Sequence, residues 1–143
     1  MSITYVSASQ VSLELEKDLQ ELLPKIFNSF NEERFFNKFS EHENFLLLMA
    51  YQDKNLVGFK FGYNITSELF YSWMGGVLPS MRGRGIAKNL MDRQHQWCRD
   101  NNFKTIETKS KKIFPEMISL NLKAGFEIIG TVEDEKILFR KSF

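Results

Sequence analysis

The chain has 143 residues, of which 43% are hydrophobic and 26% are charged. This length suits one ordinary domain with its own core, and this composition excludes a disordered chain. The 19 Lys and Arg residues nearly balance the 18 Asp and Glu residues, so a net charge of +1 provides no general attraction for DNA or RNA. We therefore predict a single domain over residues 1–143 with no nucleic-acid partner.

Cysteine, histidine and hydropathy patterns exclude further classes. The single cysteine, Cys98, cannot form an internal disulfide, and it shows no zinc-ligand spacing with the two histidines. The longest apolar run, residues 45–51, is much shorter than the roughly 20 residues that cross a bilayer. No cleavable leader is recognisable at the start of the sequence. We expect no metal, no membrane partner and a cytoplasmic location.

The N-terminal half predicts a strand, two helices and a hairpin. Residues 3–6 favour a strand, residues 32–39 a short helix, and residues 45–52 and 56–65 two strands joined by a turn. Ser12 is a candidate N-cap of the first helix, and Pro24 is expected to kink or split that helix. The apolar residues of that helix recur at helical spacing: Leu15, Leu19, Leu22, Leu23, Ile26, Phe27 and Phe30.

The C-terminal half predicts strand, glycine-rich turn, helix and a final hairpin. Residues 69–78 favour a strand in which Gly75 and Gly76 indicate a bulge, or close approach by another backbone or a ligand. The helix after the turn has this apolar stripe: Ile86, Ala87, Leu90, Met91, Gln94, Trp97 and Cys98. A strand over 105–108, a helix over 115–124 stopped by Gly125, and a hairpin over 126–132 and 136–140 complete the order. This order predicts an α/β chain with a mixed (α+β) sheet.

The turn over residues 82–87 is the candidate binding site. A glycine-rich turn that opens a helix presents unpaired N–H groups and the positive end of the helix dipole, which suit a phosphate. Gly83 and Gly85 allow close approach of the backbone, while Arg82 and Arg84 add positive charge. A tight surface turn with solvated arginines stays open as the alternative, because Gly-x-Gly alone is a weak motif.

Two nucleotide motifs do not fit this turn. A dinucleotide fingerprint needs a third glycine where the chain has Lys88, and the Gly-Lys-Ser/Thr run of a P-loop is missing. The longer pattern of a valine, one residue, a proline and Arg-x-x-Gly-x-Ala resembles the acyl-coenzyme A signature of the GNAT superfamily of N-acetyltransferases. A second similar segment, Lys-Ala-Gly-Phe followed by Glu-Ile-Ile-Gly, occupies residues 123–130. The resemblance is strongest from residue 69 onward.

The resemblance implies a GNAT fold, in which the central strands of a mixed sheet splay apart between flanking helices. It implies transfer of an acetyl group from acetyl-CoA, as cosubstrate, to a primary amine of a small molecule or peptide. The pyrophosphate is expected on the turn, the pantetheine arm along the preceding strand, and a strand amide at Val77 on the thioester carbonyl. The residues so assigned to coenzyme A are Val77, Leu78, Arg82, Gly83, Arg84, Gly85, Ile86 and Ala87. The acceptor, the acyl-chain preference and the oligomeric state stay open, with a homodimer among the alternatives.

Two positions depart from the family pattern. Many members place a tyrosine that protonates the departing thiolate where this chain has Asn121, and a basic glutamate where it has Met74. Asparagine can orient a substrate but cannot act as a general acid near neutral pH. Asn121 and Tyr71 remain the catalytic candidates, with Tyr63, Glu68 or a water chain as alternative carriers of the proton.

Other chemically interesting residues have simpler interpretations. Cys98 is expected to be a buried structural thiol, and His95 falls off the apolar stripe and is expected in solvent. His42 lies beside two glutamates and is also expected to be solvated. Trp73, with Phe70 and Tyr71, is expected either to line an acceptor pocket or to pack in the core.

Two further functions remain open. One is a coenzyme A-binding or sensory module of the same fold, suggested by the missing acid and base at positions 121 and 74. The other is an interaction domain for nucleic acid or protein that uses Lys109, Lys111 and Lys112, although the balanced charge disfavours it. These lysines are also expected either to contact the 3′-phosphate of coenzyme A or to lie in a solvated loop.

Overall fold

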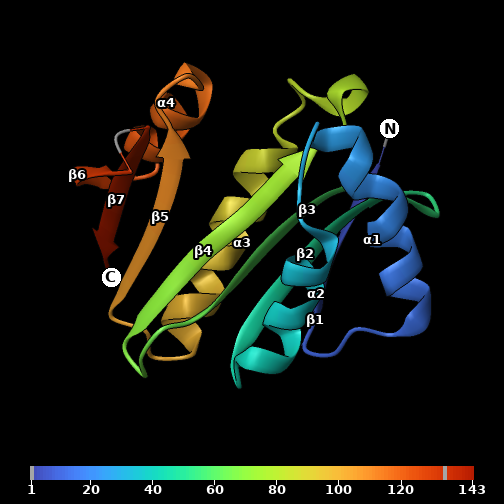
Figure 1. The fold of residues 1–143 in the computed structure, drawn as a ribbon, viewed down its shortest axis with the longest axis horizontal. Coiled ribbons are helices and arrows are strands. Elements are labelled where there is room, and N and C mark those ends of the chain that lie inside the picture. The colour runs from blue at the N-terminus through green and yellow to red at the C-terminus, as the bar shows by residue number, and fades with distance from the viewer. Residues whose placement is uncertain (1, 134) are drawn as a thin grey trace.

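The computed structural model describes residues 2–133 and 135–143, and its seven strands form one sheet in the order β1-β2-β3-β4-β5-β7-β6 (Figure 1). Each predicted helix and strand is present. In chain order the elements are β1 (Ile3–Ala8), α1 (Leu13–Ile26), α2 (Glu32–Glu41), β2 (Phe45–Gln52), β3 (Asn55–Asn64), β4 (Leu69–Val77), the 3₁₀ turn η1 (Pro79–Met81), α3 (Ile86–Asp100), β5 (Thr105–Lys111), α4 (Pro115–Lys123), β6 (Glu127–Val132) and β7 (Lys136–Ser142). The mixed α/β fold class is confirmed.

Helices cover both faces of the sheet, and each face has its own core (Figure 1). On the α1/α2 face, apolar residues of both helices pack on aromatic residues of β3 such as Phe59 and Phe61. On the α3/α4 face, Ile86, Leu90 and Met91 of α3 pack on the strands beneath them. Within the part of the chain that the structure describes, no helix combines the length and apolar character needed to cross a membrane.

Helix α1 begins as predicted and survives its proline. The Ser12 hydroxyl accepts a hydrogen bond from the Leu15 amide at 3.1 Å, which caps the first turn. The predicted split is wrong, because Pro24 lies in the last turn and the helix continues to Ile26; a kink at Pro24 stays a prediction. The missing N–H there removes a bond only from the carbonyl of Gln20, an exposed residue that water can reach. The helix ends soon afterwards, so Phe27 lies outside it as the C-cap.

The irregularity in β4 lies beside the glycine pair rather than in it. The register joins Phe61 to Met74 and Gly62 to Ser72, which leaves Trp73 as the extra residue of a bulge. The predicted bulge at residues 75 and 76 is therefore wrong, since both glycines pair regularly with β3. A Cβ on Gly76 would lie 2.6 Å from Cγ2 of Ile26, so this glycine admits a side chain of α1.

The sheet opens between its two central parallel strands. Strands β4 and β5 pair only from Leu69–Thr105 to Ser72–Thr108, and the Thr108 hydroxyl donates to the Ser72 carbonyl at 2.9 Å. Beyond this point β4 stays with β3 while β5 stays with β7. Figure 1 shows the two strands diverging toward their C-terminal ends. We call this opening the β4–β5 splay.

Candidate functional site

The turn before α3 holds its backbone open. Gly83 and Gly85 both have a φ of +78°, a left-handed conformation that glycine adopts far more readily than other residues. A Cβ built on either glycine meets no atom within 4 Å, so space is open on the turn. Gly85 is the N-cap of α3 and supplies no side-chain hydrogen bond, which leaves the first amides of the helix available. This arrangement can bind an anion.

Buried neighbours fix the turn in place. Met81 just before the turn and Ile86 within it are both almost fully buried in the core of the α3/α4 face. Arg82 and Arg84 are exposed, and Nε of Arg82 donates to the Val77 carbonyl at 3.2 Å. The turn is therefore tied to the C-terminal end of β4 and carries two guanidinium groups.

The residues at the end of β4 differ in where their amides point. The amide of Leu78 donates to the Val57 carbonyl of β3 at 2.8 Å and is already engaged. Successive residues of a strand direct their amides to opposite sides, so the amide of Val77 faces the splay. Of the two positions expected to pair with pantetheine, Val77 has the suitable backbone.

Asn121 forms a structural link in the wall of the splay. Its side chain is 1% exposed, and its Nδ2 donates to the Ser110 hydroxyl at 3.0 Å. Ser110 lies on β5 beyond the last pair with β4. The amide thus joins α4 to β5 close to the opening.

Tyr71 and Trp73 share the α1/α2 face of β4. Trp73 stacks on Phe35 with ring centroids 5.9 Å apart, and the rings of Tyr71 and Tyr63 lie 5.7 Å apart. Phe70 points to the opposite face and is fully buried, so of its two expected placements it takes the one in the core. The cause is strand alternation, which separates neighbouring residues onto two faces.

The phenol of Tyr71 is suited to donate a hydrogen bond. Burial, helped by the neighbouring Tyr63, raises the pKa of Tyr71 to about 12, so it stays protonated near neutral pH. The ammonium of Lys109 lies 5.5 Å from the centre of the Tyr71 ring. Glu68 is far less suitable, because it pairs with Lys104 at 3.3 Å beside the N-terminal end of β4, away from the opening.

A model of the Acetyltransferase (GNAT) family matches residues 13–126. This chain belongs to the GNAT acetyltransferase family. PaiA N-acetyltransferase from Thermoplasma acidophilum, solved in complex with coenzyme A, has a similar structure with a TM-score of 0.84, 16% identity and 100% coverage of both chains. Ribosomal-protein-S18-alanine N-acetyltransferase from Escherichia coli has a TM-score of 0.83 and 12% identity, and the match covers 99% of this chain and 94% of that one.

A third similar structure is Ard1 from Thermoplasma volcanium, with a TM-score of 0.82, 18% identity and coverage of 99% of this chain and 98% of that one. None of the curated proteins matches this chain in sequence. These structural likenesses confirm the GNAT fold that the resemblance implied.

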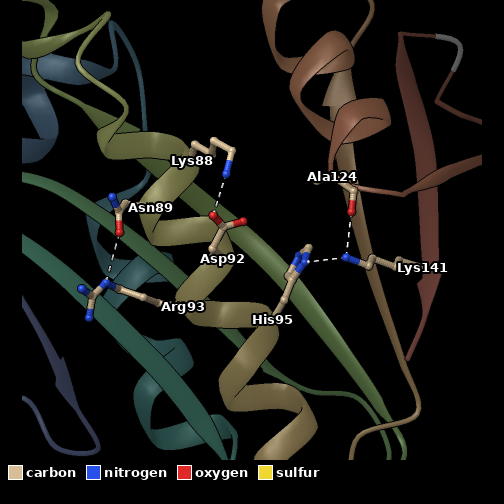
Figure 2. Close-up of polar contacts among 7 residues, drawn as sticks. All are labelled: Lys88, Asn89, Asp92, Arg93, His95, Ala124 and Lys141. Carbon is tan, nitrogen blue, oxygen red and sulfur yellow. Dashed lines mark hydrogen bonds and ion pairs between the residues drawn. The ribbon is translucent and has the colours of Figure 1, made fainter.

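His95 of this GNAT chain is buried rather than solvated as expected. It is 3% exposed, and its Nδ1 lies 3.1 Å from Nζ of Lys141, which also donates to the Ala124 carbonyl at 2.7 Å (Figure 2). The prediction failed because α3 is covered on a second side by β7 and by the ring of Phe126. Burial, then the charge of Lys141, lowers the pKa of His95 to about 3, so the ring is neutral.

Short polar pairs lie on the outer surface of α3. Lys88 donates to Asp92 at 2.8 Å, and Nε of Arg93 donates to Oδ1 of Asn89 at 3.4 Å (Figure 2). Each pair joins residues four apart on exposed helix, where such contacts add little stability. These residues decorate the helix that supports the GNAT turn rather than forming a second site.

The other residues singled out from the sequence lie outside the turn. Cys98 is fully buried as expected, and burial raises its pKa to about 12. His42 is partly buried and stacks on Tyr63 at 3.8 Å instead of extending into solvent. Lys111 and Lys112 are exposed. Among residues 2–133 and 135–143, no three His, Cys, Asp or Glu side chains are grouped where they could hold a metal ion.

Lys60 of β3 is a partly buried cation that the sequence pattern did not single out. It alternates with Phe59 and Phe61, whose rings belong to the core of the α1/α2 face, and so it points toward α3. Desolvation by burial lowers its pKa to about 8. The available signal was a charged residue in the middle of an otherwise apolar and glycine-rich strand.

Proposed function

We propose that this protein is an N-acetyltransferase that moves an acetyl group from acetyl-CoA to a primary amine of a small molecule or peptide. The observation that supports this most is the open glycine turn at the N-terminus of α3, beside a sheet that splays at the same level. An anion-binding turn next to an unpaired strand edge suits a ligand with a pyrophosphate and an extended amide-containing arm.

The residues present fit coenzyme A. The amides of residues 83–87 and the guanidinium of Arg82 would hold the pyrophosphate in the space that a side chain on Gly83 or Gly85 would fill. The amide of Val77 would hold the end of the pantetheine arm. Acetyl-CoA supplies an activated thioester carbonyl.

The acceptor side follows from the same geometry. Tyr71 and Trp73 are partly exposed on the α1/α2 face of β4, so an amine would approach the splay past these rings. An ordinary amine has a pKa near 10.4 and must lose its proton before it attacks. The protonated phenol of Tyr71 cannot remove that proton at neutral pH, so its role is to orient the acceptor while water carries the proton. Alignment of amine and thioester supplies much of the rate.

A coenzyme A-binding or sensory module remains the second candidate. It is favoured by the state of Asn121, whose amide is buried and bonded to Ser110 at the position where a proton donor is expected. Met74 at the second departing position offers no titratable group.

The deciding experiment measures thermal unfolding with acetyl-CoA, dephospho-CoA or NAD, because a ligand that binds the folded state raises its stability. We expect acetyl-CoA to raise the melting temperature of the wild type and of Arg93→Glu but not of Arg82→Glu. Arg93 is the control because its guanidinium lies over the ring of Tyr5, 4.4 Å from the ring centre, and not at the turn. Thiol release is then measured on a panel of amines. No shift at millimolar acetyl-CoA overturns the proposal, whereas a shift without thiol release on any amine supports the sensory module.

A further inference from the structure

Lys60 approaches the β4–β5 splay from the side of β3. Its Cα is the register partner of Gly75 on β4, and a Cβ on Gly75 would lie 3.4 Å from Cγ of Lys60. Gly75 is exposed, since β5 has already left β4 at this level. The Lys60 stem therefore passes a residue without a side chain, close to the edge of the opening.

Lys60 is partly buried, yet no described residue balances the charge of its amine. Within the described part of the chain it has neither a hydrogen-bond nor an ion-pair partner. A desolvated ammonium without a counter-ion costs stability, and a methionine of similar length would fill this place without that cost. A structural role therefore accounts for the stem of Lys60 but leaves its charge unexplained.

The proposed acetyl transfer creates a negative charge that could balance the ammonium of Lys60. Cleavage of a thioester leaves a thiolate, and a thiolate in a partly desolvated opening needs a nearby cation or a proton. Asn121 supplies neither, and Tyr71 lies on the other face of β4. Lys60 is on the face of the turn and of α3, where the arm of coenzyme A would lie.

We propose that Lys60 is the proton donor to the sulfur of coenzyme A during acetyl transfer, an inference that rests on the proposed function. The acceptor nitrogen forms its bond to the carbonyl carbon, and the carbon–sulfur bond breaks with its electron pair on sulfur. Lys60 donates an Nζ proton to this sulfur, which yields the free thiol. The neutral Lys60 then takes up, through solvent, the proton that the acceptor nitrogen releases.

Few other groups near Lys60 change charge around neutral pH. On α3, burial lowers the pKa of His95 to about 3 and raises the pKa of Cys98 to about 12, so both are neutral. Asp92 is exposed and bonded to Lys88. Lys141 of β7 contacts His95 and a carbonyl, and burial, then the charge of Arg99, lowers its pKa. The register partners of Lys60 on β2 and β4 carry no titratable group. A titration in this region that disappears in Lys60→Met therefore belongs to Lys60 and not to Lys141.

The first test measures the thiol pKa of bound coenzyme A from thiolate absorbance, with desulfo-CoA as the blank. We expect thiolate in the wild-type complex to form about one pH unit or more below where it forms in free coenzyme A, because a charged Lys60 and a thiolate stabilise each other and titrate as a pair. Lys60→Met is expected to abolish this difference, and Lys60→Arg to keep it. Lys104→Met, which removes an exposed lysine beside the far end of β4, is the matched control and should behave as the wild type.

The second test uses an amine found to be acetylated. We expect kcat of the wild type to fall as pH rises through about 8, since neutral Lys60 has no proton to give. Lys60→Met should lose this limb and slow by on the order of 10²-fold, and Lys60→Arg should also be slow because arginine does not release its proton.

The outcomes separate this inference from the proposed function. An equal thiol pKa in the wild type and Lys60→Met, with the thermal shift by coenzyme A intact, overturns the role of Lys60 and leaves the acetyltransferase proposal standing. Absence of any thermal shift in the wild type overturns both. A lowered thiol pKa that only the Met variant loses supports Lys60.

Discussion

The two faces of the sheet are packed with different kinds of side chains. The α3/α4 face holds buried polar side chains, and the amide atoms of Gln94 and Nε2 of His95 have no partner among the described residues. The α1/α2 face is packed with aromatic rings, and the cation of Arg34 lies 5.6 Å from the centre of the Trp73 ring at its rim.

This difference separates two kinds of recognition on one scaffold. A face with open backbone amides and buried polar groups suits one ligand of fixed shape and charge, as coenzyme A is under the proposed function. A face of rings offers broad contact area with few directional bonds, so it constrains the acceptor less. Variants matched across the two faces test whether this division is real.

Gly85→Val is expected to have the largest effect. It forces a β-branched residue to a φ of +78° and fills the open side of the turn, so the thermal shift by acetyl-CoA should disappear. The fold itself should lose about 1–2 kcal/mol of unfolding free energy. Gly130→Val on β6, where a Cβ also meets nothing within 4 Å, is the control and should keep the shift. A shift retained in Gly85→Val would remove the turn from the binding site.

Two tryptophan variants compare the faces directly. Trp73→Ala and Trp97→Ala should each lower the unfolding free energy by about 2–4 kcal/mol in urea, because both partly buried rings pack on other rings. Only Trp73→Ala should raise the KM for the acceptor, while both variants keep their acetyl-CoA affinity. An equal rise in KM for Trp97→Ala would contradict the assignment of the acceptor to the α1/α2 face.

A pH series tests the buried histidine of the α3/α4 face. Below pH 6.5 the unfolded chain protonates His95 while the folded protein, with a pKa of about 3, does not, so stability falls as pH drops. We expect His95 to account for a loss of about 2 kcal/mol between pH 7 and pH 5. Urea unfolding of His95→Gln should show a correspondingly shallower pH dependence. Identical slopes for the wild type and His95→Gln would refute the burial argument.

Asn121→Ala is expected to have the smallest effect. It leaves the Ser110 hydroxyl without its partner and should reduce the unfolding free energy by about 1 kcal/mol, with a coupling of similar size in a cycle with Ser110→Ala. Acetyl-CoA should still raise the melting temperature. A fall in kcat of more than about a hundredfold without loss of stability would make Asn121 a catalytic residue instead.

Sequence alone was sufficient to predict structural features that are local in the chain. The turn at residues 82–87 is contiguous in the chain, and the Ser12 cap joins residues three apart. The sequence therefore predicts both features directly. The burial of His95 and Lys60 could not be predicted in this way, because it depends on β7, α3 and β4 lying close together in the folded protein. The bulge at Trp73 was likewise displaced from the glycine pair, since register is set by the partner strand.

The short seam between β4 and β5 also has a mechanical meaning. One half of the sheet contains β1 to β4 and the other contains β5 to β7. All ladder pairs between the two halves lie at one end of β4 and β5, so a single short segment joins them. A force that separates the two halves would load these pairs one at a time, beginning with Ser72 and Thr108. The hydrogen bond from the Thr108 hydroxyl to the Ser72 carbonyl reinforces this first pair. On the α3/α4 face, Lys141 of β7 contacts His95 of α3 and forms a second connection between the two halves.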